Sequence, residues 1–368
     1  MRIAEFTLER YFAKWEFAVR HVLGASDLEP YRLDELLALA DDDARCRWDA
    51  LTLGYAESLG LHALREAIAQ LYDHVASDDV ITFAGAEEGI YLTMHALLQA
   101  GDHAVVMWPS YQSLHEVARS AGASVTLVPL DPRDWSFDVD AVAAAMRPNT
   151  RVIVVNSPHN PTGSQLSADQ LARLVSIAEQ HGVHLFSDEV YRLLEHDAPT
   201  LPNAADCSDR AISLGVMSKS FGLAGLRIGW VATRDRGLYR KLASLKDYTT
   251  LCNSAPSEIL ALIALRARER VLERSRAIVL GNLELLDGFF ARNADRFAWV
   301  RPRAGSVCFP KLLTGDVDEF AAALVEHEGV LIVPGSQFAY PGPHFRLGYG
   351  RRDMPQALAR LEAFAEAV

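Results

Sequence analysis

The chain has 368 residues, more than twice the usual single-domain size of about 150, so two domains are expected. Half of the residues are apolar and 23 % are charged, which provides enough apolar surface for a large core and excludes intrinsic disorder. The 48 acidic residues outnumber the 36 basic ones, and a net charge of −12 gives no general attraction for nucleic acid or for an anionic membrane. No signal peptide and no run of ~18 uncharged apolar residues is visible, so we expect no membrane association and a cytoplasmic location.

The four cysteines are widely separated in the sequence and form no CxxC pair: Cys46, Cys207, Cys252 and Cys308. This spacing is typical of reduced thiols in the core rather than of a disulfide framework or a metal centre. We therefore expect no metal site.

Two sequence periods alternate between about residues 54 and 231. Helical spacing of apolar residues predicts helices over 61–75, 87–99, 114–121 and 168–180. Short apolar runs predict strands over 80–84, 104–107, 125–128, 152–155, 183–186, 212–214 and 228–232. Strands and helices that alternate in this way predict an α/β domain around a mostly parallel sheet.

Beyond Ser254 the pattern changes to longer helices, over 256–273 and 278–291, followed by shorter strands and helices. We interpret this part as a smaller α+β domain that the N-terminal segment joins. The expected division is 46–270 for the large domain and 1–45 with 271–368 for the small one.

Polar, turn-forming segments follow three of the predicted strands. They are Asn156–Gly163, Ser187–Tyr191 and Met217–Gly229. In open α/β sheets ligands bind beyond the carboxyl ends of the strands, so these segments are the candidate site. The common nucleotide and hydrolase signatures GxGxxG, GxxxxGK[ST], HExxH and GxSxG are absent from the sequence.

Taken together, the motifs HNPTG (159–163), DEVY (188–191) and SKSFGLAGLRIG (218–229) resemble those of the fold-type I pyridoxal-phosphate (PLP) enzymes, specifically the class I and II aminotransferases. The resemblance runs from about residue 55 to residue 346. It implies a three-layer large domain with a mostly parallel central sheet, a smaller α+β domain, and pyridoxal 5'-phosphate as cofactor.

The resemblance assigns the chemistry of the cofactor ring to four residues. Lys219 matches the lysine that forms the aldimine and moves protons at the substrate α-carbon. Asp188 matches the aspartate that keeps the pyridine nitrogen protonated. Asn160 and Tyr191 match the amide and phenol that bond the phenolic oxygen. From the residues alone, these side chains could also be a surface lysine, a helix cap, a turn residue and a core aromatic.

The phosphate ligands implied by the resemblance are Ser218 and Arg227, whose planar guanidinium suits an anion. Gly85 and Ala86 would add backbone amides at a helix N-terminus. Glu87 departs from this pattern, because a carboxylate that faced the phosphate would repel it. We therefore expect its side chain to point away or the loop to lie differently.

Three further matches concern the ring, the partner subunit and the substrate. Tyr111 matches the aromatic residue that stacks on the cofactor ring. Tyr55 matches a tyrosine that reaches the phosphate of a neighbouring subunit, which implies a homodimer with composite active sites. Arg346 matches the arginine that binds the substrate α-carboxylate, with Asn160 beside it. A core tyrosine or a surface arginine remains the alternative at these positions.

The resemblance implies transfer of an amino group from an α-amino acid to a 2-oxo acid through the Lys219 aldimine. Elimination, decarboxylation, cyclisation and oxidation on the same scaffold stay open, as does an effector-sensing domain without turnover. Glu9, Glu16 and Asp27 could face a basic side chain, as in PLP enzymes that make arginine-derived antibiotic building blocks. The plainer interpretation is that these three are solvated helix charges.

Overall fold

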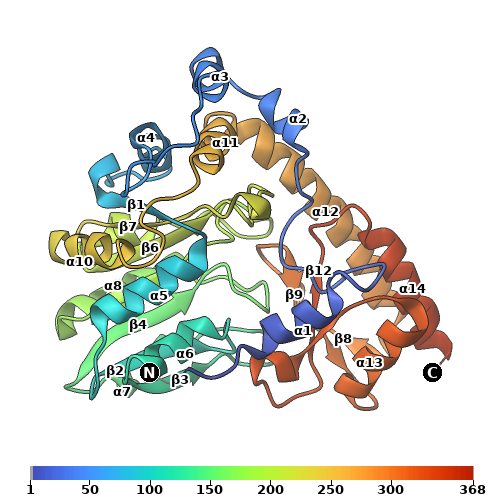
Figure 1. The fold of residues 1–368 in the computed structure, drawn as a ribbon. Helices are drawn as coiled ribbons and strands as arrows, with labels where there is room; N and C mark the ends of the chain where they lie inside the picture. Colours follow the sequence, from blue (N-terminus) through green and yellow to red (C-terminus); the bar gives the residue numbers. More distant parts are fainter. Residues whose placement is uncertain (1–2, 368) are drawn as a thin grey trace.

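The computed structural model describes residues 3–367 and is built around one seven-stranded sheet (Figure 1). The strand order is β1-β7-β6-β5-β4-β2-β3, and only β7 runs antiparallel to its neighbours. The strands are β1 Val80–Phe83, β2 His103–Trp108, β3 Ser124–Pro129, β4 Thr150–Asn156, β5 His184–Asp188, β6 Ala211–Val216 and β7 Gly229–Thr233. The predicted α/β class with a mostly parallel sheet is confirmed.

Helices cover both faces of this sheet, which explains why its central strands are apolar along their whole length. Side chains of a strand alternate between faces. Ile153 and Val155 of β4 pack with α7 and α8 on one face, while Val152 and Val154 pack with α5, α6 and α10 on the other. The molecule therefore has the three layers expected.

The helices that surround the sheet, and those in the chain segment that precedes β1, are mostly short. They are α2 Leu33–Leu37, α3 Asp42–Asp49, α4 His62–Ala69, α5 Ala86–Leu97, α6 Ser113–Ser120, α7 Val139–Ala145, α8 Ala168–His181, α9 Ala204–Cys207, α10 Arg236–Lys246 and α11 Ala255–Arg266. Two 3₁₀ turns, η1 Ser77–Asp79 and η2 Ala224–Leu226, belong to the same part.

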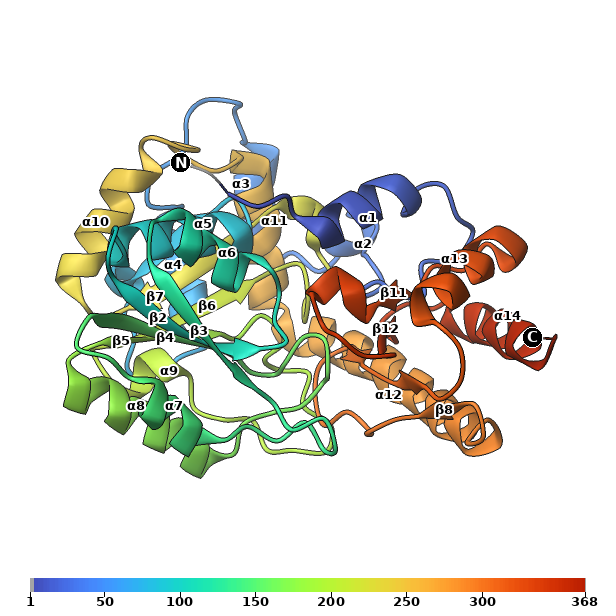
Figure 2. The same cartoon turned by 90° about the horizontal axis from the view of Figure 1, so that it is seen from below.

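The C-terminal part is smaller and is reached along the 25-residue helix α12 Arg268–Arg292 (Figures 1 and 2). It contains a three-stranded sheet in the order β11-β12-β9 and the pair β10-β8. Its elements are β8 Phe297–Ala298, β9 Val307–Cys308, β10 Lys311–Leu312, α13 Val317–Glu328, β11 Val333–Pro334, η3 Gly335–Phe338, β12 Phe345–Gly348 and α14 Met354–Ala367.

The N-terminal segment lies against this C-terminal part before it crosses to the large sheet. Helix α1 Thr7–Trp15 packs against η3, and His21 forms a β-bridge with Val330. Figures 1 and 2 both show α1 beside the C-terminal part. Leu36 and Ala44, by contrast, pack in the core formed by α4 and α11. The chain thus changes sides before α2, earlier than the expected boundary at residue 45, and the domain division itself stays a prediction.

Three details differ from the sequence-based expectation. The break between the two long helices falls at Ala267, not between residues 273 and 278, and follows the fully buried stretch Glu258–Leu265 of α11. Helices α7 and α10 were not predicted. All four cysteines are free, but Cys46 and Cys207 are exposed rather than in the core. Among residues 3–367 no helix is long and apolar enough to cross a membrane.

Candidate active site

Lys219 lies in the turn that follows β6, where its backbone is fixed on both sides. The Leu223 amide donates to the Met217 carbonyl at 2.9 Å, and the Gly222 amide donates to the Lys219 carbonyl at 2.9 Å. The Lys219 ammonium donates to the Ser26 hydroxyl at 2.8 Å and lies 5.5 Å from the centre of the Tyr191 ring. The lysine is therefore held facing the N-terminal segment.

Asp188 ends β5, the next strand of the sheet, and its side chain is buried at 4 % exposure. Burial raises the pKa of this carboxyl to about 7, and the nearby charge of Lys219 acts in the opposite direction. The Val190 amide donates to Asp188 Oδ1 at 3.2 Å. A buried carboxyl in this position suits a cationic N–H group as its partner.

The HNPTG segment is tied to the same strand end by Asn156, the last residue of β4. Its amide nitrogen donates to the Asp188 carbonyl at 2.9 Å, and its amide oxygen accepts from the Asn160 backbone at 2.7 Å. The Asn160 side-chain oxygen in turn accepts from Arg346 Nη1 at 3.0 Å. Asn160, Asp188 and Arg346 are thus part of one connected network.

Arg346 on β12 is buried at 1 % exposure without a carboxylate bonded to it. Nε and Nη2 donate to the Gly24 carbonyl at 3.1 and 2.8 Å, and Nη1 donates to Asn160. A guanidinium has five N–H donors, so two remain, one on each terminal nitrogen, which is the number that a bidentate carboxylate accepts. Burial lowers the pKa of Arg346, while the nearby Tyr191 and Tyr111 and the carboxylates of Glu9 and Asp27 act in the opposite direction.

The candidate phosphate cup lies between the start of α5 and the turn after η2. Arg227 Nη1 lies 3.5 Å from the Ser218 hydroxyl. Gly85 has φ +92°, and a Cβ at this position would lie 2.4 Å from Arg227 Nη2, so only glycine admits the guanidinium this close. Arg227 itself has φ +52°, a left-handed conformation that costs a non-glycine residue on the order of 1–3 kcal/mol.

One expected phosphate ligand needs correction. The Gly85 amide is not free, because it donates to the Phe83 carbonyl at 2.8 Å. The first amides of a helix have no intrahelical acceptor, so at the start of α5 those of Ala86 and Glu87 are available instead. The contribution of Gly85 is the close approach of Arg227.

Two tyrosines flank this space. The Tyr191 side chain is 1 % exposed, yet its hydroxyl has no hydrogen-bond partner among residues 3–367. The Tyr111 hydroxyl donates to Glu9 Oε1 at 2.8 Å, and its ring lies 5.0 Å from that of Phe6. Helix α1 therefore forms one wall of the site.

Tyr55 is the one predicted site residue that the structure leaves apart from the others. Its side chain is 91 % exposed, with the equally exposed Leu53 close to it in sequence. Within one chain it has no place in the network around Lys219.

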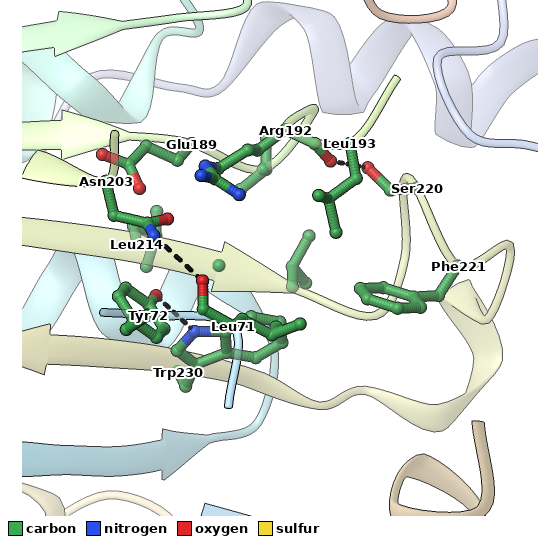
Figure 3. Close-up of a pocket in the computed structure, with 13 residues that line it drawn as sticks. Leu71, Tyr72, Glu189, Arg192, Leu193, Asn203, Leu214, Ser220, Phe221 and Trp230 are labelled. Atoms are coloured by element: carbon green, nitrogen blue, oxygen red, sulfur yellow. Dashed lines mark hydrogen bonds between the residues drawn. The ribbon is translucent and has the colours of Figure 1, made fainter. Parts of the chain in front are cut away.

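A separate small cavity lies behind the site and is lined by Tyr72, Glu189, Asn203, Ser220 and Trp230, among others (Figure 3). The Trp230 indole donates to the Tyr72 hydroxyl at 2.9 Å, and the Asn203 amide donates to the Leu71 carbonyl at 3.0 Å. Lys219, Asp188 and Arg346 do not line it. This cavity is therefore not taken as part of the candidate site.

Comparison with known proteins identifies the family. Residues 49–361 match the family described as aminotransferase class I and II. The chain belongs to the class I and II aminotransferase family. As a member of this family, it is a PLP-dependent enzyme.

Three members of the family illustrate the range of similarity. Capreomycidine synthase from Streptomyces vinaceus is 30 % identical over 359 residues, which cover 96 % of this chain and 92 % of that protein. The crystal structure of a PLP-dependent aminotransferase from Streptococcus suis 89-1591 is 29 % identical with a TM-score of 0.94, covering 100 % of this chain and 99 % of that one. The PLP-dependent cyclase OrfR is 30 % identical with a TM-score of 0.91, covering 100 % and 98 %.

The residues present fit this family's cofactor. Ser218, Arg227 and the first amides of α5 form a cup of donors suited to a phosphate. The buried carboxyl of Asp188 suits a protonated ring nitrogen, and the unpartnered Tyr191 hydroxyl can bond the phenolic oxygen. These functional roles remain predictions, whereas the clustering of the residues is a property of the fold.

Sequence reasoning missed three contributors to the site: Ser26, Asn156 and the Gly24 carbonyl. Asn156 carried a usable signal, because it is a polar residue at the end of a buried strand. Ser26 and Gly24 carried none, since their partners lie 193 and 322 residues away in the sequence.

Proposed function

We propose that this enzyme transfers an amino group from an α-amino acid to a 2-oxo acid. The observation that carries the proposal is the buried guanidinium of Arg346, which has no carboxylate bonded to it, has two N–H donors left and is joined through Asn160 and Asn156 to the end of β5. A carboxylate is the ligand whose two oxygens can accept both of these remaining N–H donors. An amino acid and its 2-oxo acid share that group, so one arginine can serve both halves of the exchange.

The other residues follow from this placement. The cofactor, when bound, supplies an electron sink for the negative charge that develops at the substrate α-carbon. The Lys219 amine moves the proton at that carbon, Asp188 holds a proton on the ring nitrogen, and Tyr111 packs on the ring. Arg227 and Ser218 hold the phosphate, and Asn160 and Tyr191 orient the phenolic oxygen.

Cyclisation of an amino acid is the second candidate. Two relatives that cover nearly the whole chain, capreomycidine synthase and the cyclase OrfR, support it. Both reactions begin with removal of the α-proton, so the residues named above serve either.

We further propose a homodimer with shared active sites. The exposed Tyr55 and Leu53, together with Tyr248 at 88 % exposure, support this proposal, because large apolar side chains are rarely left in water as a group. Tyr55 would then reach the phosphate cup of the partner.

The test is to incubate the purified holoenzyme with each amino acid and 2-oxoglutarate or pyruvate, and to identify the products by mass spectrometry. Appearance of a 2-oxo acid with a new amino acid supports transamination, whereas a product of the substrate alone, without amino-group exchange, contradicts it and favours cyclisation or elimination. Lys219→Ala is the control, and borohydride reduction followed by peptide mapping must place the cofactor on Lys219 in the parent enzyme. A cofactor found on another lysine refutes the assignment.

A further inference from the structure

Glu87 is the second residue of α5 and stands beside the phosphate cup. Its Oε2 atom is buried and has no hydrogen-bond partner among residues 3–367. Glu87 as a whole is partly exposed, but a buried carboxylate oxygen without a donor is costly, and native structures normally pair it. The expectation that this side chain simply avoids the site therefore does not explain its position.

Glu9 on α1 reaches the same space from the other side. Its carboxylate accepts from the Tyr111 hydroxyl at 2.8 Å and acts electrostatically on both Glu87 and Arg346. Burial and the negative charges of Glu87 and Glu9 together raise the pKa of Tyr111. Two carboxylates from distant parts of the chain thus lie around the ring that is expected to cover the cofactor.

The cationic side chains of this region already have a partner in the structure or a role in the proposed function. Arg351 donates to Asp27 at 2.7 Å, and the proposed function assigns the other three to the phosphate, the substrate carboxylate and the cofactor: Arg227, Arg346 and Lys219. Arg227 acts on the charge of Glu87 at a distance, but no ion pair joins Glu87 to a cation among residues 3–367. A cationic group on a ligand would supply such a partner.

The two acids adjoin the groups that the proposed function assigns to the cofactor and the substrate. The Tyr191 hydroxyl is buried, lacks a partner, and lies close enough to Arg346 to act on its charge. Its ring also faces the Lys219 ammonium. Glu87 acts electrostatically on Asp188 and Glu9 acts on Arg346, so both acids lie near the expected position of a bound amino acid.

We propose that Glu87, with Glu9 beside it, selects amino acids whose side chain ends in a cationic amino or guanidino group. The inference rests on the proposed function, because it takes the amino acid to be bound through Arg346. A charged side chain would pair with the buried carboxylate, whereas a neutral one of equal shape would leave it unpaired. Electrostatic complementarity at this position would thereby set specificity.

The charge state of Glu87 predicts that the preference for a cationic substrate depends on pH. Burial and the negative charge of Glu9 raise the pKa of Glu87 to about 7, while Arg227 and the neighbouring Ser113 act in the opposite direction. Asp188 and Tyr111 also share its electrostatic environment. A bound cation favours the charged carboxylate, so the preference for a cationic substrate should rise as the pH increases through about 7.

The experiment compares arginine with citrulline, which has the same shape but an uncharged ureido group. Dissociation constants are measured by titrating the holoenzyme and following the absorbance of the bound cofactor, a readout that does not depend on turnover. Lysine and norleucine form a second pair, which separates an amino from a guanidino preference. We expect the cationic member of at least one pair to bind about tenfold or more tightly, which is ~1.4 kcal/mol.

Glu87→Gln should reduce that ratio toward one and leave the affinity for the neutral member nearly unchanged. Glu5→Gln, which removes an exposed carboxylate from the N-terminal segment that carries Glu9, is the control and should keep the ratio of the parent enzyme. The ratio should increase with pH only where Glu87 is present, since the effect of Asp188 on both amino acids of a pair cancels. Glu87→Asp, which keeps the charge, should retain part of the preference.

Equal affinity for the members of both pairs in the parent enzyme overturns the inference, even if Glu87→Gln fails to fold. An unchanged ratio in Glu87→Gln overturns it as well. In both cases the proposed function stands as long as amino acids alter the cofactor spectrum. If no amino acid alters that spectrum, the proposed function fails instead.

Discussion

Asp188 is a carboxyl group in surroundings that oppose its charge. Its side chain is almost fully buried, and burial raises its pKa from 3.8 to about 7. In the unfolded chain the same group ionises near its ordinary value. Between these two pKa values the native state binds more protons than the unfolded state, so this residue makes the free energy of unfolding fall as pH rises.

The first prediction concerns Asp188→Asn in protein freed of its cofactor. The uncharged amide removes the cost of a buried carboxylate, so the variant should be more stable than the parent at about pH 8 and nearly equal to it at about pH 3, below both pKa values. The difference is on the order of 4 kcal/mol at most, because the pKa of Asp188 rises from 3.8 to about 7 on folding. Thermal unfolding at the two pH values measures it, and a gap that does not grow with pH would count against a buried, strained carboxyl.

Arg346 leads to a second prediction at the same scale. Arg346→Lys keeps a positive charge but loses the paired donors, so KM for amino acids should rise roughly 10- to 100-fold. The affinity for the cofactor should change little, because the guanidinium bonds Gly24 and Asn160 and lies outside the phosphate cup. Steady-state kinetics and cofactor titration separate the two effects. An equal loss of both would instead give Arg346 a role in the fold.

At the scale of elements, the turn between β1 and α5 controls where Arg227 lies. Gly85→Ala places a methyl group 2.4 Å from Arg227 Nη2. Because that atom is the end of a flexible side chain, the guanidinium should shift rather than the backbone. We predict about tenfold weaker cofactor binding, measured by titration of the cofactor-free protein.

Gly101→Ala is the matched control for this change. Gly101 has φ +90°, close to the +92° of Gly85, but a Cβ there meets nothing within 4 Å. Both variants should lose about 1 kcal/mol of stability from the strained backbone. Equal cofactor affinity in the two variants would mean that crowding at Gly85 does not position Arg227.

The elements that could be predicted from the sequence are those whose pattern is local. The strands of the large sheet are buried on both faces, so each one is a continuous apolar run, and the residues that end them carried the cofactor motifs. Helix α10 was missed although Asp235, its N-cap, accepts from the Gly237 and Leu238 amides. The signal for this helix was present and was not used.

The wall of the site that α1 provides could not be predicted in the same way. Glu9 and Ser26 acquire their roles only through Tyr111 and Lys219, from which they are separated by 102 and 193 residues. No spacing within the first thirty residues encodes those contacts. Glu9 thus shows why the plainer interpretation of a solvated helix charge was incomplete.

At the scale of the whole molecule, the exposed Tyr55 leads to a prediction about the assembly. In a two-fold dimer with shared sites, mixing Tyr55→Ala and Lys219→Ala chains places both lesions in one site of each heterodimer and none in the other. Half of the randomly mixed dimers would be heterodimers, so activity should recover to about a quarter of that of the parent. Refolding the mixture and assaying it measures the recovery.

This test requires that Tyr55→Ala alone be severely impaired and that subunit exchange be demonstrated, for example with a mass-tagged chain. If both conditions hold and no activity returns, Tyr55 acts within its own chain or not at all in catalysis. The proposal of shared sites would then be withdrawn, while the assignments of Lys219 and Arg346 would be unaffected.

The hydrogen bonds between Arg346 and the Gly24 carbonyl also have a consequence for the folding of the chain during its synthesis on the ribosome. Their partners are 322 residues apart, and at a synthesis rate of 5–20 residues per second the Gly24 segment waits roughly 15 to 65 s for the arginine to be made. During that interval the large sheet can form and offers α1 the contacts of Tyr111 and Gln112, but the C-terminal half of its docking surface has not yet been made. The apolar residues of the N-terminal segment that pack on the C-terminal part therefore stay uncovered for most of synthesis, which makes them an expected point of contact for a molecular chaperone.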